Sequence, residues 1–64
     1  MWIDLTDHDS GSQLRVNLDN VTYIEARTIE GRGYALLNLT SGQTLGVRED
    51  ISEVARKMMD PLYE

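Results

Sequence analysis

Residues 34–47 constrain the fold most, because two segments of alternating apolar and polar residues flank a short glycine-containing loop. A three-residue loop with Gly42 in the left-handed conformation places Leu37 opposite Leu45. A two-residue turn would instead place Leu37 opposite Gly46 and divide the apolar side chains between the two faces. The pattern therefore predicts a β-hairpin with a three-residue loop and one continuous apolar face.

A helix is expected directly after this hairpin, over about residues 51–60. Asp50 can accept hydrogen bonds from the amides of the first turn, and Glu53 completes a pattern close to a capping box. Pro61 ends the helix, because the residue before a proline is disfavoured in helical geometry. The apolar residues then fall on one stripe of the helix, which faces the hairpin: Ile51, Val54, Ala55, Met58 and Leu62.

Three further alternating segments precede the hairpin, and Asp19-Asn20 is typical of a two-residue turn. That turn would pair the second segment with the third, placing Leu18 opposite Val21, Val16 opposite Tyr23 and Leu14 opposite Glu25. We therefore expect an α+β fold in one domain, residues 1–64: a small antiparallel β-sheet of about five strands followed by one C-terminal α-helix packed on it. The strands are predicted within residues 2–6, 13–18, 21–28, 34–39 and 43–47.

Size and charge narrow the function. The chain has 64 residues, 11 of them acidic and 6 basic, for a net charge of -5. This balance argues against nonspecific binding to nucleic acid or to anionic lipid, and it favours a positively charged partner surface. There is no apolar run of membrane-span or signal-peptide length, so we expect a cytoplasmic protein. A chain of this size buries only about 60% of its unfolded surface, which favours a homo-oligomer or an obligate protein partner.

Asp4 in the first predicted strand, with Asp7, His8 and Asp9 in the turn that follows it, could be imagined as an oxygen-rich metal site. The spacing fits no standard metal motif, and we favour a solvated turn in which Asp and Ser bond to their own backbone. His8 is the only histidine and no serine lies in a nucleophile motif. We therefore expect no enzyme, no catalytic residue, no metal and no cofactor.

Two groups of side chains are candidates for binding. The large amphipathic or apolar residues Trp2, Tyr23, Tyr34 and Leu36 are candidates for an interface, and the alternative is that they edge the core. Among the arginines, Arg15, Arg27 and Arg48 are candidates for binding an anion in a cleft between subunits, with Arg32 as a further member. The simpler interpretation of the arginines is salt bridging to neighbouring acids.

Across nearly its whole length the chain resembles the small FlbD-like (SwrD-like) flagellar and swarming motility family. The resemblance rests on Ile3, Leu5, Thr6, Gly11, Asn17, Val21, Ile24, Glu25, Leu39, Gly42, Val47, Glu49, Glu53 and Val54. It implies a noncatalytic role related to motility. Val21 to Ala26 and Gly42 to Arg48 also look like the end of a LytTR-type domain, which contacts DNA through basic residues, whereas the charge here is reversed.

The leading hypothesis is a noncatalytic bacterial or phage module that acts through protein–protein binding. The alternative is a binder of a nucleotide or other small anion, or a phage-encoded inhibitor, that uses an intersubunit cleft. A third hypothesis is acidic mimicry of nucleic acid, for which the acids should cluster on one face.

Overall fold

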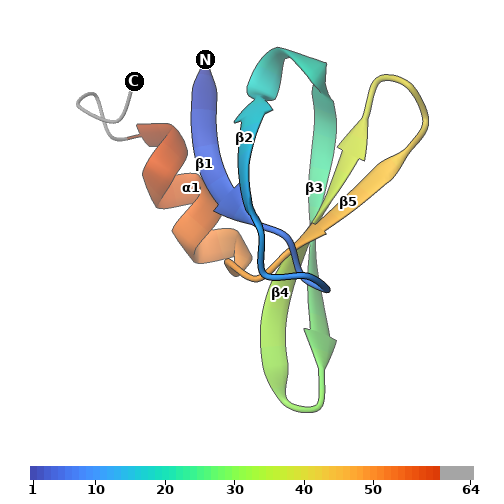
Figure 1. Ribbon diagram of the computed structural model, residues 1–64, viewed down its shortest axis with the longest axis vertical. Helices are drawn as coiled ribbons and strands as arrows, with labels where there is room; N and C mark the ends of the chain where they lie inside the picture. The colour runs from blue at the N-terminus through green and yellow to red at the C-terminus, as the bar shows by residue number, and fades with distance from the viewer. Residues whose placement is uncertain (60–64) are drawn as a thin grey trace.

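The computed structural model describes residues 1–59, which form five strands, one short 3-10 turn and one α-helix (Figure 1). The elements are β1 (Trp2–Thr6), β2 (Gln13–Asn17), the turn Leu18–Asn20, β3 (Val21–Ile29), β4 (Arg32–Leu39), β5 (Thr44–Val47) and α1 (Ile51–Met59). The described chain is therefore a small α+β fold, as the alternating patterns predict.

The strands form two antiparallel sheets rather than one. β1 pairs with β2, and the second sheet has the order β3-β4-β5. The sheets meet at one corner, where Asp7 bridges Val47 and the His8 amide donates to the Gly46 carbonyl at 3.0 Å. Beyond that corner α1 lies beside β1 (Figure 1), and the Lys57 Nζ donates to the Asp4 carbonyl at 2.8 Å. The expectation of a single sheet is not met, because β1 pairs along its length with β2 and reaches β5 only through this bridge at its end.

The β4–β5 hairpin has the predicted register. Leu37 lies opposite Leu45, and Ala35 lies opposite Val47. Gly42 has a φ of 91°, the left-handed conformation that the three-residue loop requires. The period of the apolar residues and the loop chemistry were sufficient to fix this pairing, because only one register places all the large apolar side chains on one face.

The predicted pairing of the second strand with the third is wrong. Leu18–Asn20 form a 3-10 turn in which the Asn17 Oδ1 accepts from the Asp19 amide at 3.1 Å. This turn carries the chain from one sheet to the other, so Val16 lies opposite Ile3 and not opposite Tyr23. The second strand accordingly ends at Asn17 instead of residue 18.

The third strand pairs with the fourth through a turn that is shorter than the connection expected over residues 29–33. β3 runs to Ile29 and β4 starts at Arg32, two residues before the predicted start at residue 34. Only Glu30 and Gly31 connect them, with φ values of 51° and 79°. Because glutamate rarely adopts a positive φ, its residue type gave little sign of so tight a turn.

The core lies between the two sheets and the helix. Its fully or nearly fully buried members are Ile3, Leu5, Val16, Ala35, Leu37, Val47 and Val54. The predicted capping box is present: the Glu53 amide donates to the Asp50 Oδ1 at 2.8 Å, and the Asp50 amide donates to the Glu53 Oε1 at 3.4 Å. Of the predicted helical stripe only Val54 is buried; Ile51 and Met58 are 38% and 40% exposed. Leu62 and Pro61 lie outside the described residues.

The Glu49 side chain, just before α1, links the end of β1 to the helix. Its carboxylate accepts from the Thr6 amide at 2.9 Å and from the Thr6 hydroxyl at 3.0 Å, and the Lys57 Nζ lies 3.9 Å away. Burial opposes ionisation of this carboxyl, but the hydrogen bonds from Thr6 and its own backbone amide, with the charge of Lys57, lower its pKa below the ordinary value. No helix among residues 1–59 is long and apolar enough to cross a membrane.

Candidate functional site

The three-stranded sheet has an outer face that points away from the core. In register, Tyr23 lies opposite Asn38, Glu25 opposite Leu36 and Arg27 opposite Tyr34, so these side chains share one face of the sheet. Tyr34 and Leu36 are half-buried, whereas Tyr23 is 59% exposed. Three of the four predicted interface residues therefore lie on one surface, which we call the outer face.

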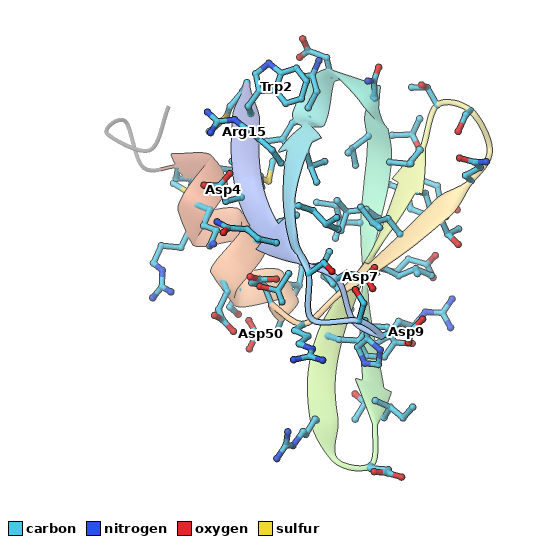
Figure 2. The ribbon with its side chains drawn as sticks, in the orientation of Figure 1. Trp2, Asp4, Asp7, Asp9, Arg15 and Asp50 are labelled. Carbon is cyan, nitrogen blue, oxygen red and sulfur yellow. The ribbon has the colours of Figure 1, made fainter. Side chains whose placement is uncertain are left out.

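Trp2, the fourth, lies on the other sheet. It is half-exposed on β1, where it pairs with Asn17 of β2 (Figure 2). There it lines a separate hollow of about 320 Å³ with Leu14, Leu39 and Leu45. The structure does not bring Trp2 to the tyrosine on β4.

The His8 ring packs on the Tyr34 ring, which belongs to the outer face. The ring centroids are 4.6 Å apart and the planes are inclined by 44°. Both residues lie against β5: a Cβ at Gly46 would be at ordinary contact distance from them, 3.5 Å from the His8 Cβ and 3.9 Å from the Tyr34 Cε2. The loop after β1 and strand β4 thus bring the two aromatic rings together beside β5. Sequence spacing alone did not reveal this contact.

The loop that holds His8 is fixed by its own polar groups. The Asp7 Oδ2 accepts from the Ser10 amide and from the Ser10 hydroxyl, both at 2.9 Å, and the Ser10 Oγ accepts from the Ser12 amide at 3.1 Å. The hydrogen bonds from Ser10 lower the pKa of Asp7 below its ordinary value. The predicted solvated turn is confirmed in its hydrogen bonding.

The acids around this loop do not converge. Asp4 lies on β1, where its Oδ1 is 3.7 Å from the Arg15 Nη1, and Figure 2 shows both well away from Asp7 and Asp9. The Asp9 side chain is 98% exposed, and its Oδ1 lies 3.3 Å from the His8 Nδ1. Within residues 1–59, no three His, Cys, Asp or Glu side chains are grouped so that they could hold a metal ion.

Two hollows of opposite charge flank the His8–Tyr34 pair. The first, of about 310 Å³, adds Asp7, Asp9 and Leu36 to the pair. The second, of about 860 Å³, is lined by the same two rings with Ile29, Glu30, Arg32, Gly33 and Arg48. We call these the acidic hollow and the basic hollow. The aromatic pair is their shared wall.

The three arginines predicted to bind an anion are separated within one chain. Arg15 lies beside Asp4, and the Arg27 Nη2 bonds to the Glu25 Oε2 at 2.9 Å. Only Arg48 reaches the basic hollow, where its Nε donates to the His8 carbonyl at 3.2 Å.

In the basic hollow Arg48 is accompanied by Arg32, and not by Arg15 or Arg27. Among the described residues, no carboxylate lies within ion-pair distance of Arg32 or of Arg48. The sequence analysis includes Arg32 as a further member of the arginine group, and the tight turn at the end of β3 brings it into the basic hollow beside Arg48.

Comparisons with known proteins complete this description. The sequence matches no model of a known protein family, and no similar curated protein or solved structure is found.

Proposed function

We infer that the protein is a noncatalytic module that binds a cationic segment of another protein on its outer face. The observation that carries this inference is the aromatic pair His8–Tyr34 beside the exposed Asp9 and the half-buried Leu36. Half-buried rings offer a large contact area at low entropic cost, and they are enriched where proteins associate.

Charge selects the partner. A basic side chain of the partner meets the carboxylates of Asp7 and Asp9, and its aliphatic or aromatic neighbour packs on Tyr34 and Leu36. The net charge of -5 attracts a cationic chain at longer range and raises the rate of association. The partner is therefore a protein segment that combines Lys or Arg with an apolar residue.

The resemblance to the flagellar and swarming motility family supports a noncatalytic role of this kind. The residues that carry the resemblance include Leu5 and Val47 in the core and Glu49 in the network that joins β1 to the helix. These residues maintain the fold. Tyr34 and Leu36, which are not among the residues of the resemblance, would then distinguish one member from another, and we propose motility as the setting for the module.

Selection of random peptides on the immobilised protein tests this function. We expect enriched peptides to carry Lys or Arg next to an apolar residue, and we expect Tyr34→Ala to weaken their binding by about tenfold or more. Trp2→Ala is the matched control, because it removes an aromatic side chain from the other sheet. Peptides without basic residues, or peptides that bind the Tyr34→Ala variant as tightly as the native protein, would overturn the proposal.

A second candidate function is binding of a small anion in the basic hollow. The specific observation that favours it is the pair Arg32 and Arg48, which have no carboxylate partner within residues 1–59 and lie beside two aromatic rings. Guanidinium groups suit phosphate, and a ring pair suits a nucleobase.

Titration with ATP, ADP and inorganic phosphate, followed by NMR, tests this candidate. Shifts at Arg32 and Arg48 that saturate, and that disappear in Arg48→Gln but not in Arg15→Gln, would support it. The absence of shifts at millimolar ligand would leave protein binding as the only function proposed for this surface.

Acidic mimicry of nucleic acid receives no support from the geometry. The acids lie at separate places: Asp7 and Asp9 in the first loop, Asp19 in the 3-10 turn, Glu30 at the β3–β4 turn, and Asp50 and Glu53 at the start of α1. Two of these, Asp50 and Glu53, are used in capping the helix.

A further inference from the structure

β3 is the longest strand, with nine residues, and it lies at the edge of its sheet. Within residues 1–59 no strand pairs with its outer side. An edge strand of this length exposes a row of amide and carbonyl groups that can template pairing with another chain. In Figure 1 its second half extends with β4 beyond the helix, so the end of this edge stands clear of the body.

The two-residue turn fixes which backbone groups point outward. Ile29 and Arg32 flank the turn and form a hydrogen-bonded pair, and the pattern alternates from there along the ladder. Ile24, Ala26 and Thr28 therefore direct their amides and carbonyls away from β4. The Ala35 amide agrees with this parity: it lies opposite Ala26 and donates to the Glu49 carbonyl at 3.0 Å, away from β3.

The sequence of β3 is complementary to itself when it is reversed about Ala26. Antiparallel pairing of two copies in that register places Glu25 opposite Arg27 of the second copy, and Tyr23 opposite Ile29 of the second copy. The same register pairs Ile24 with Thr28, both of which have outward-pointing backbone groups. Backbone parity and side-chain chemistry thus select one alignment.

The side chains are already placed for this pairing. Glu25 and Arg27 lie on the outer face, where the Glu25 Oε1 also accepts from the Asn38 Nδ2 at 3.1 Å. Tyr23 and Ile29 are 59% and 49% exposed, although both belong to residue types that are usually well covered. In the paired state each would be covered by the other, at both ends of the new ladder.

An apolar groove continues the same edge. It has a volume of about 280 Å³ and lies between the first half of β3 and α1, lined by Val21, Thr22, Ile24, Ile51, Ala55 and Met58 among others. With Ala26 at the centre of the pairing, the turn at Glu30 and Gly31 of the second copy passes beside Thr22 and Val21. The turn of the second copy therefore lies at the rim of this groove, next to the β3 residues that line it.

We propose that the protein forms a symmetric homodimer in which β3 pairs with β3 of a second copy about Ala26. The two three-stranded sheets become one continuous sheet of six strands. This assembly uses Tyr23 at the edge of the outer face and Ile29 at the wall of the basic hollow, whereas Tyr34 and the acidic hollow take no part in the pairing. Sedimentation therefore tests the dimer, and binding of basic peptides to the Tyr34 variant tests the function proposed above, so that either can fail without the other.

Charge reversal tests the register. Arg27→Glu places like charges opposite each other at two symmetric positions, and we expect the dimer dissociation constant, measured by sedimentation over a range of concentrations, to rise about tenfold or more. The double variant E25R/R27E restores opposite pairs and should restore the dimer. A native protein that is monomeric throughout the range, or a double variant as weak as Arg27→Glu, would overturn the proposal.

Hydrogen exchange provides a second measurement that does not depend on variants. The amides of Ile24, Ala26 and Thr28 point away from β4, so they should exchange slowly in the dimer and faster as the protein is diluted. Exchange of these three amides that is fast at all concentrations would contradict pairing at β3 even if an oligomer were found. The Ala35 amide is the internal control, because its acceptor lies within the same chain.

Discussion

The two neighbours of β4 differ in how well their side chains are buried. On one side β4 pairs with β5, and the side chains that face inward there, Ala35, Leu37 and Val47, are fully buried. On the other side β3 pairs with β4 but has no partner beyond it within residues 1–59, and Tyr23 and Ile29 are about half-exposed. The comparison teaches that the buried core and the edge proposed for pairing lie on opposite sides of β4, so substitutions on the two sides should change different measurements.

The largest loss of stability should come from a substitution in the buried core on the β5 side of β4. Leu37→Ala removes a fully buried side chain at the centre of the core, and we expect it to lower the free energy of unfolding by about 2–5 kcal/mol. Ile51→Ala on the exposed helical stripe is the comparison variant and should cost well under half as much. Urea denaturation measures both, and equal losses would show that the helical stripe is buried in solution.

The network at Glu49 should give the next largest effect. Its lowered pKa means that it stabilises the fold above the ordinary carboxyl value of 4.5, and that this contribution is lost as the pH falls through the lower pKa of the folded state. Glu49→Gln should therefore lower the free energy of unfolding at neutral pH by about 1–2 kcal/mol. Below pH 4.5 the variant should lose less stability with falling pH than the native protein does. Thermal denaturation between neutral and acidic pH checks both effects. If the stability of the variant falls with acidic pH as steeply as that of the native protein, the pH dependence comes from other carboxyl groups.

The smallest effect should be a gain in stability at the turn that ends β3. Glu30 has a φ of 51°, a conformation that costs a non-glycine residue about 1 kcal/mol, so Glu30→Gly should raise stability by about 0.5–1 kcal/mol. Gly31→Ala, at a φ of 79°, should lower it by a similar amount. Thermal denaturation at one concentration compares the two. A loss of stability in Glu30→Gly would indicate that the Glu30 side chain contributes more than its backbone strain removes.

Local patterns predicted the elements of this fold better than its pairings. The β4–β5 register and the capping of α1 by Asp50 were predictable because each depends on residues only a few positions apart. The pairing of β1 with β2 was missed because Asp19-Asn20 suits either a hairpin turn or the 3-10 turn that is observed. Choosing between them requires knowing which sheet each strand joins, and that depends on contacts far apart in sequence.

The candidate site was predictable to a smaller extent. Tyr34 and Leu36 were identified because alternation places them on the outer face. His8 reaches the same surface through the loop after β1, and no periodicity describes such a position. Arg32 and Arg48 were named among the arginines, but which of the arginines meet depends on the tight turn after β3. Sequence reasoning named the strand residues and the arginines of this surface, but it did not predict that His8 packs on Tyr34 between them.

The contact between Thr6 and Glu49 has a consequence for how the molecule is made. The first strand is held by a side chain 43 residues further along, and the core is closed by Val54 of the last described element. A chain still being synthesised therefore lacks the groups that anchor its own beginning. We expect folding to follow release of the helix from the ribosome, and until then the nascent strands remain open to chaperones and to neighbouring chains.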